Sequence, residues 1–310
     1  MDLLSRFRGS LLGLAVGDAL GAPVEFELRG SFAPITGLRS GGPFNLRAGD
    51  WTDDTSLALC LAESLVERHG FDPRDQVERY VRWWKEGHLG CTGNCFDIGN
   101  TTKASLQRFM ETGNPYSGPT NPETGSNGSL MRLSPVPLFY HTHPREAVEY
   151  SGLSSKTTHG ALAAIDSCRY LGALIIGALK GIKREALLTA RYEPAAGIWC
   201  KTPLTSEVDA VARGSFQRSE PPVIKAQGTA AKTLEAALWA FRKGRSFEEG
   251  CLLAVNLGDD SDTVGAVYGQ LAGAYYGVDA IPNMWRSELS KVDVLENMAD
   301  KLFNASKYVK

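Results

Sequence analysis

The chain has 310 residues, 43% of them hydrophobic and 22% charged, a balance typical of a globular protein with a sizeable core. A formal net charge of −2 gives no reason to expect nucleic acid or an anionic membrane as a partner. Six cysteines scattered along so long a chain favour free thiols in a reducing compartment over a disulfide framework.

The N-terminal segment "RFRGSLLGLAVGDALGA" shares features of a secretory signal peptide, with two arginines close to an apolar stretch. Asp18 interrupts that stretch and its glycines recur at a helical spacing, so we interpret it as the first helix of the fold. No uninterrupted apolar run approaches the ~20 residues that a membrane-spanning helix requires. The sequence therefore predicts a cytoplasmic protein without a membrane span.

Most of the chain carries apolar residues at a spacing of three and four, which predicts helices. The predicted helices span residues 3–18, 54–68, 74–86, 99–111, 145–152, 160–180, 227–243, 247–257 and 263–276. Stretches rich in proline and glycine predict loops at 28–50, 112–137 and 194–222. We expect one all-α domain over residues 1–310, with long functional loops.

Two of these helices carry glycine at every fourth position. The glycines are Gly9, Gly13, Gly17 and Gly21 in the first helix, and Gly265, Gly269, Gly273 and Gly277 in the other. Glycine costs about 1 kcal/mol relative to alanine inside a helix, so the pattern predicts that neighbouring helices approach closely there. If the two helices pack together, Asp18 and Glu25 come near Asp260 and Asp262.

The motif "WTDDTS" places Asp53 and Asp54 between Thr52 and Thr55, at the predicted start of a helix. One such side chain is enough to cap the free N–H groups of a first turn. Two adjacent acids between threonines exceed what a cap needs, and they indicate a ligand.

The motif "GDDSDTVG" repeats this arrangement before a second helix, with Asp260, Asp262 and Thr263. Three interpretations are open: two ordinary N-caps, the aspartyl-phosphate loop of a phosphohydrolase, or a shared site for divalent metal. The phosphohydrolase interpretation requires a parallel sheet that continues downstream, whereas the remaining residues are mostly helical in pattern. We favour the metal, because carboxylate and hydroxyl oxygens suit Mg²⁺ or Mn²⁺ and two such clusters can hold two ions.

The motifs "GDALGAPVE", "WTDDTS", "FDIGN", "GSNGSLMR", "TTHG" and "GDDSDTVGAVYGQLAGAYYG" follow one another between residues 6 and 277. This series resembles the ADP-ribosylhydrolase family, and most closely its bacterial branch, the dinitrogenase reductase-activating glycohydrolases. The resemblance implies an all-helical fold and a centre of two divalent cations, Mn²⁺ or Mg²⁺. It also implies hydrolysis that releases ADP-ribose from modified protein side chains, arginine above all.

The resemblance carries over residue by residue. It implies the metal ligands Thr52, Asp53, Asp54, Asp260, Asp262 and Thr263. Glu25 resembles the acid beside the metals and the substrate, and Asp97 resembles the acid/base of the bacterial branch. The implied substrate-binding residues are Asn100, Asn127, Gly128, Ser129 and His159.

Each of these assignments has an alternative in ordinary structure. The glycine-rich stretch at 125–129 can present N–H groups to a diphosphate, with Arg132 adding charge, but a plain turn uses the same residues. Asp97 can simply cap the following helix, and His159 can be a structural histidine. Cys91 and Cys95 in "CTGNC" lack the spacing and the second pair of a zinc site.

We hypothesise that two cations hold the ribose hydroxyls and supply an activated water, while Asp97 or Glu25 handles the proton that the leaving group needs. The expected partner is an ADP-ribosylated protein, with dinitrogenase reductase as one target, and ADP-ribose is the product. Two alternatives stay open: an inert relative that only binds ADP-ribose, or a hydrolase of serine-linked or free ADP-ribose derivatives. Loops 28–50 and 112–125 are expected to shape the leaving-group side.

Overall fold

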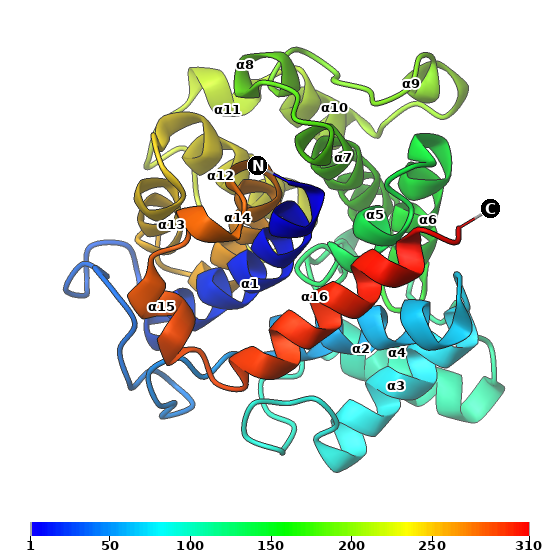
Figure 1. Cartoon of the computed structure of the whole chain (residues 1–310), viewed down its shortest axis with the longest axis horizontal. Helices are drawn as coiled ribbons and strands as arrows, with labels where there is room; N and C mark the ends of the chain where they lie inside the picture. Colours follow the sequence, from blue (N-terminus) through cyan, green and yellow to red (C-terminus); the bar gives the residue numbers. More distant parts are fainter. Residues whose placement is uncertain (1, 310) are drawn as a thin grey trace.

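Helices form all the regular secondary structure of residues 2–309, which are the residues that this computed structural model describes (Figure 1). Two isolated bridges, Gly41 with Leu46 and Ser126 with Thr229, are the other paired backbone segments in that range. The all-α prediction is therefore confirmed.

The sequence analysis missed one long helix, the 15-residue α16 (Val292–Ser306). The other long helices coincide with the predicted segments to within a few residues. They are α1 (Leu3–Gly21), α2 (Asp53–Arg68), α3 (Pro73–Glu86), α4 (Asn100–Thr112), α6 (Pro144–Lys156), α7 (Leu162–Leu179), α12 (Ala230–Lys243), α13 (Phe247–Val255) and α14 (Ser261–Tyr276). Helices α3, α4 and α6 bury one apolar face, whereas α1, α7 and α14 are buried on nearly all sides.

The predicted loops 112–137 and 194–222 are not wholly irregular, which corrects the sequence analysis. Short helices interrupt them: α5 (Pro135–Phe139), α9 (Ile198–Lys201), α10 (Ser206–Ala212) and α11 (Ser215–Arg218). Further short elements are α8 (Arg184–Leu187), α15 (Asn283–Glu288) and the 3₁₀ turns Ala22–Val24, Pro122–Thr124 and Val278–Ala280, while α16 (Val292–Ser306) ends the fold. Helices this short depend on tertiary packing, as in α5, where Val136, Leu138 and Phe139 are buried.

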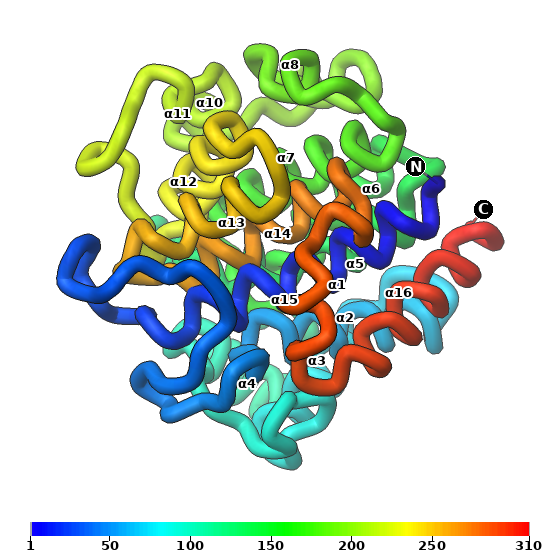
Figure 2. The backbone as a smooth tube through the Cα atoms, turned by 60° about the vertical axis from the view of Figure 1, so that its left-hand side comes forward, coloured from blue at the N-terminus to red at the C-terminus, as the bar shows by residue number. Residues whose placement is uncertain are grey.

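Helices α1 and α14 run antiparallel through the centre of the molecule and touch along their glycine faces (Figure 2). A Cβ atom on Gly269 would overlap the carbonyl oxygen of Gly13, and one on Gly273 would overlap that of Gly9. The predicted close approach is present. Gly277 differs from the rest, because it follows the last turn of α14 at φ 76° and so serves as its C-cap.

The antiparallel pairing brings the C-terminal end of α1 against the start of α14. Gly21 abuts the backbone of Asp262, and the Ser261 hydroxyl donates to the Gly21 carbonyl (3.0 Å). Glu25 follows α1 after one 3₁₀ turn, so the acids of both motifs reach the same end of the helix pair.

The start of α2 is fixed to α1 by a buried carboxylate. Asp18 accepts hydrogen bonds from the backbone N–H groups of Thr52 (2.9 Å) and Thr55 (3.1 Å) and from the Thr55 hydroxyl (2.6 Å). These bonds satisfy first-turn donors that have no partner inside the helix. Asp53 and Asp54 are thereby held at the same end of the molecule as α14.

One helix in residues 2–309, α7, is long and apolar enough to cross a membrane by length and composition alone, with a mean hydropathy of 1.5. Within the fold, 94% of that helix is buried among the other helices. Burial of this kind is typical of the core helix of a globular protein.

We expect Gly269→Ala to lower the free energy of unfolding by about 1–3 kcal/mol, since the new methyl group must push two backbones apart. The gain of up to about 1 kcal/mol from the better helix propensity of alanine offsets only part of this. Urea unfolding followed by circular dichroism measures the difference. Gly37→Ala is the matched control, because its nearest neighbour would lie 3.6 Å away. Equal stability of the two variants would contradict a tight helix contact.

Candidate active site

The two acidic motifs meet in a single cleft of about 460 Å³. Its walls are formed by Glu25, Phe26, Asp53, Asp54, Asp97, Ile98, Gly99, Asn100, Thr101, Thr102, Ser126, Asn127, Gly128, Met131, His159, Asp260, Asp262 and Thr263. Six carboxylates and neither lysine nor arginine line it, among the residues that the structure describes. The cleft therefore has the side-chain composition of a candidate cation site.

Helix geometry explains how so many acids come together. Asp53 and Asp54 occupy the first turn of α2, Asp260 is the N-cap of α14, and Asp262 lies in its first turn. Both helices thus direct their N-terminal ends toward the cleft, where the partial positive charge of the helix dipole favours carboxylates. Glu25, which follows α1, and the loop residue Asp97 complete the group of acids that lines the cleft.

Three of these side chains form the tightest oxygen cluster. One carboxylate oxygen from each of Glu25, Asp97 and Asp262 lies within 4.8 Å of the others. Glu25 Oε2, Asp54 Oδ2 and Asp262 Oδ1 are buried without a hydrogen-bond partner in the described structure. Buried oxygens of this kind cost free energy unless something binds them, and hard oxygen donors are the ligands that Mg²⁺ and Mn²⁺ prefer.

The pKa values record the repulsion among these groups. Burial, followed by the charges of Asp262, Asp97 and Asp260, raises the pKa of Glu25 to about 12. Burial raises the pKa of Asp97 to about 7, with Asp18 and Asp260 adding to the effect. Carboxylates gathered in this way favour a bound proton or a bound cation, either of which removes part of their repulsion.

The same causes act on the helix-borne acids. Burial, then neighbouring carboxylates, raises the pKa values of Asp53, Asp54 and Asp262 well above the ordinary aspartate value. The pKa of Asp260 is also raised by burial, while a hydrogen bond from Asn127 opposes the shift.

The two threonines of the predicted ligand set occupy different environments. Thr263 lines the cleft directly. Thr52 is fully buried as the N-cap of α2, where its hydroxyl accepts from the Asp54 N–H and lies 3.5 Å from Asp262 Oδ2. Thr52 therefore bridges the two acidic motifs from below the cleft floor.

The glycine-rich stretch forms one wall of the cleft. Asn127 donates from Nδ2 to Thr233 Oγ1 (2.8 Å) and to Asp260 Oδ2 (2.7 Å), which ties this wall to α12 and α14. Gly128 also lines the cleft, whereas the Ser129 hydroxyl points into the interior and bonds to Ser155 Oγ (2.8 Å). The structure thus brings Asn127 and Gly128 to the predicted place and turns the Ser129 side chain away, because the chain enters the core there.

His159 lies against Gly128 and is held by a chain of hydrogen bonds. The fully buried guanidinium of Arg132 donates to Thr158 Oγ1 (2.7 Å), and that oxygen lies 2.8 Å from His159 Nδ1. Arg132 can only donate, and Nδ1 is the only acceptor within reach of the Thr158 hydroxyl in the described residues. The hydroxyl proton therefore points to Nδ1.

This arrangement fixes the protonation of His159. Burial, helped by the charge of Arg132, lowers the pKa of His159 to about 3, so the ring is neutral. With Nδ1 accepting, the single proton lies on Nε2, which has no protein partner in the described residues. A Cβ on Gly128 would come within 3.0 Å of Nε2. The histidine offers an uncharged N–H donor at the cleft wall.

Sequence reasoning missed several residues of this site. The sequence analysis expected Asp18 only to lie near the acids of the second motif, whereas its carboxylate binds the start of α2. An aspartate inside an otherwise apolar helix was the signal for such a role. Thr158 lay inside a recognised motif and was not singled out. Phe26 gave no signal, because its position depends on a backbone φ of 65°, a left-handed conformation that costs an aromatic residue about 1–3 kcal/mol.

The loops 28–50 and 112–125 contribute no lining residue to the cleft among those described, contrary to the expectation that they shape it. Asn100, at the exposed start of α4, and Ile98 occupy that side together with Phe26. Residues 25–26 and 97–102 therefore supply that part of the cleft lining.

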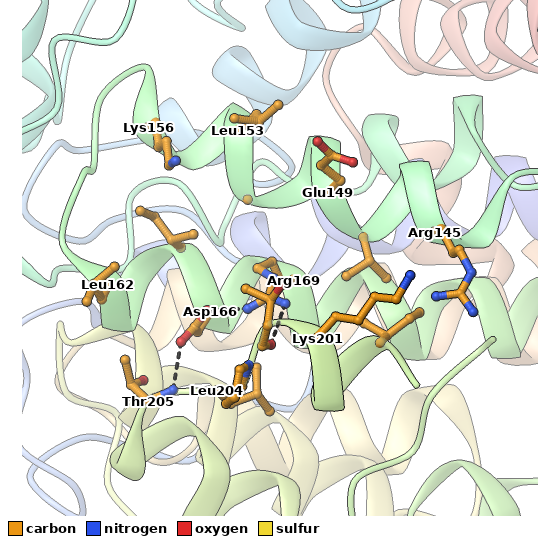
Figure 3. A pocket seen from close by; sticks show the side chains of 16 residues that line it. Arg145, Glu149, Leu153, Lys156, Leu162, Asp166, Arg169, Lys201, Leu204 and Thr205 are labelled. Atoms are coloured by element: carbon orange, nitrogen blue, oxygen red, sulfur yellow. Dashed lines mark hydrogen bonds and ion pairs between the residues drawn. The ribbon is translucent and has the colours of Figure 1, made fainter. Parts of the chain in front are cut away.

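A larger hollow of about 700 Å³ lies elsewhere, between α6, α7 and the segment around α9 (Figure 3). Arg169 on its floor is already paired with Asp166 (2.7 Å) and with the Thr202 carbonyl (2.8 Å). It holds no group of gathered carboxylates and none of the predicted site residues. This hollow is larger than the acid-lined cleft, but the cleft gathers the ionisable side chains, so we take the cleft as the candidate active site.

Comparison with known proteins gives a consistent picture. The family model described as ADP-ribosylglycohydrolase matches residues 1–309. The chain is 37% identical to ADP-ribosylarginine hydrolase Tri1 of Serratia proteamaculans, over 97% of this chain and 80% of that protein. It is 31% identical to ADP-ribosyl-(dinitrogen reductase) glycohydrolase of Rhodospirillum rubrum, over 92% and 90% respectively. A solved structure titled ADP-ribosylglycohydrolase-related protein complex superposes with a TM-score of 0.86 at 45% identity, covering 98% of this chain and 99% of that one.

The raised pKa values predict how stability depends on pH without metal. An acid whose pKa is higher in the folded than in the unfolded protein contributes stability that is fully present below the unfolded pKa, about 4 for aspartate. That contribution is lost as the pH rises through the folded-state pKa, which is about 7 for Asp97. The protein in chelator should therefore have a lower melting temperature at pH 8 than at pH 5. At pH 8, Mn²⁺ at 100 times its Kd should restore about 2.7 kcal/mol.

Neutralising one acid of the cleft tests this cause. Asp54→Asn should raise the melting temperature in chelator at pH 8 and reduce the shift with Mn²⁺, because one repelling charge and one ligand are lost. Glu67→Gln, at the exposed far end of the same helix, is the matched control and should behave as wild type. The assignment fails if Mn²⁺ stabilises Asp54→Asn as much as wild type.

The hydrogen-bond chain predicts a single tautomer of His159, observable by long-range ¹H–¹⁵N NMR as a protonated Nε2 and an unprotonated Nδ1. Thr158→Val removes the donor to Nδ1 and should yield a mixture of tautomers. Thr157→Val is the matched control, because the Thr157 hydroxyl also accepts from Arg132 (3.3 Å) but does not contact the imidazole. A wild-type ring protonated on Nδ1 would refute the chain.

Proposed function

This chain belongs to the ADP-ribosylglycohydrolase family, and we propose that it is a metal-dependent hydrolase that releases ADP-ribose from modified protein side chains. The preferred bond is the N-glycosidic bond of mono-ADP-ribosyl-arginine. The observation that carries this proposal is the convergence of six carboxylates and no cationic side chain in one cleft. The name of the Serratia relative, an ADP-ribosylarginine hydrolase, supports the choice of arginine.

The residues present fit a pair of divalent cations, Mn²⁺ or Mg²⁺. The ligands would come from the two helix starts, with carboxylate oxygens lacking protein partners in both. When bound, such ions polarise substrate oxygens and lower the pKa of a bound water. The proposed set is Thr52, Asp53, Asp54, Asp260, Asp262 and Thr263.

We assign proton transfer to Asp97 or Glu25. A guanidine is strongly basic, so it leaves a ribose carbon only as a protonated or proton-assisted group. Asp97, with a pKa of about 7, exists in both protonation states near neutral pH and can give a proton to that nitrogen. Glu25 stays protonated in the metal-free cleft and is its alternative in this role.

The uncharged wall of the cleft binds the rest of ADP-ribose. His159 Nε2–H donates to an acceptor of the ligand, and the absence of a side chain on Gly128 lets the ligand approach the backbone. Asn127 is already engaged with Asp260, so it couples ligand binding to the acidic helix start. Asn100 is exposed at the rim and free to contact the ligand.

The partner is an ADP-ribosylated protein, and the Rhodospirillum relative is named for dinitrogen reductase as its modified protein. Six free cysteines support a reducing, cytoplasmic setting. An inert binding relative is disfavoured, because every acid expected from the sequence is present in the cleft. A hydrolase of serine-linked ADP-ribose is the second candidate function. Assays with arginine-linked and with serine-linked substrate distinguish the two candidates.

The deciding experiment incubates the protein with arginine-ADP-ribosylated protein and follows released ADP-ribose with Mn²⁺ or with chelator. We expect release only with metal, and Asp97→Asn to lower kcat by about 10²–10⁴-fold. Asp53→Ala and Asp260→Ala should abolish turnover and weaken Mn²⁺ binding, whereas Glu67→Gln should retain both. Tight ADP-ribose binding without release would favour the inert relative, and normal activity of both alanine variants would refute the metal assignment.

A further inference from the structure

One lining residue of the cleft remains without a role. Phe26 lies at the rim directly after Glu25, and 66% of its surface is exposed to solvent. No aromatic or cationic side chain among the described residues stacks on its ring. A single exposed ring is ordinary on a protein surface, so the case for a role rests on the place of Phe26 in the cleft lining and on its backbone conformation.

The backbone at Phe26 is tied to the segment that precedes α14. Its N–H donates to the Asp259 carbonyl (2.7 Å), and the Asp259 N–H donates in return to the Glu27 carbonyl (2.7 Å). Phe26 (φ 65°) and Asp259 (φ 50°) both adopt left-handed conformations within this pair. A Cβ on Gly258 would come within 2.6 Å of the Glu27 carbonyl, so the two segments are in close backbone contact.

This contact joins the rim to the metal-binding motif, because Asp259 precedes Asp260. The backbone of Phe26 is therefore fixed relative to the start of α14, where Asp260 and Asp262 lie. Non-glycine residues in such conformations persist where the surrounding structure enforces them, and they cluster at ligand sites.

The position of Phe26 places it at the reacting end of the cleft. Its neighbour Glu25 shares the oxygen cluster with Asp97 and Asp262. The bond to be cleaved must lie at these acids, so the group beyond that bond, on the rim side, is the leaving group. The adenosine end of the ligand extends toward the other wall, where Gly128 and His159 lie.

We propose that Phe26 is a specificity-determining residue whose ring stacks on the guanidinium group of the ADP-ribosylated arginine. A guanidinium is planar and cationic, and it binds aromatic faces by stacking and by cation–π attraction. The cleft adds a negative potential with no competing lysine or arginine on its walls. A serine-linked substrate offers no cation, so the ring discriminates in favour of arginine. This inference rests on the proposed function.

The test compares Phe26→Leu and Phe26→Tyr in the full-length protein with Mn²⁺. Leucine keeps an apolar side chain without an aromatic face, whereas tyrosine keeps the face. We expect Phe26→Leu to lower kcat/KM for ADP-ribosyl-arginine about 10-fold, equivalent to about 1.4 kcal/mol. Phe26→Tyr should stay within twofold of wild type. The Kd of ADP-ribose, measured by calorimetry, should be unchanged in both, because the product lacks the guanidinium.

Leu28→Ala is the matched control, since Leu28 is equally exposed (68%) on the same turn and does not line the cleft. Wild-type kcat/KM in Phe26→Leu, or an equal loss in Leu28→Ala, would overturn the role of the ring. A parallel loss of ADP-ribose affinity in Phe26→Leu would also overturn it, because the ring would then contact the nucleotide. A wild-type protein that releases no ADP-ribose from arginine would overturn the proposed function together with this inference.

Discussion

The contact between the glycine faces of α1 and α14 is the constraint on which the site depends. Three glycines on each helix (Gly9, Gly13 and Gly17 in α1; Gly265, Gly269 and Gly273 in α14) face a carbonyl oxygen of the other helix, so the two backbones pack in one register. That register sets Gly21 against Asp262 and brings residues at both ends of the sequence to one place. The loss of helix propensity at the six interior glycines is offset by close packing along both helices.

Repulsion among the gathered carboxylates opposes this arrangement, and nearby groups reduce part of that repulsion. Two helix N-termini face the gathered acids, and hydrogen bonds from Thr52 and Thr55 satisfy the buried Asp18 carboxylate beneath them. The remaining repulsion appears as raised pKa values and as carboxylate oxygens without protein partners. A divalent cation bound among these carboxylates would relieve their mutual repulsion.

The cleft is divided into two chemically different halves. The charged half contains the acids and, at its rim, the exposed ring of Phe26. The other half is neutral and is built from Gly128 and His159, with the buried Arg132 behind them and out of the cleft. Arg132 acts there through Thr158 rather than as an exposed charge, which differs from the direct phosphate contact that the sequence suggested.

The sequence by itself determined the all-α class, the approximate limits of every long helix except α16, and the acids at the starts of α2 and α14, because helical periodicity and caps are local properties. Glu25 and Asp97 were indicated by the family resemblance. The sequence also indicated the glycine contact, since only close packing explains glycine at every fourth position. Tertiary structure alone decided that Ser129 turns into the core, that His159 carries its proton on Nε2, and that Phe26 is held left-handed at the rim. Each of these depends on partners distant in the chain or on the burial of neighbouring groups, which no local pattern encodes.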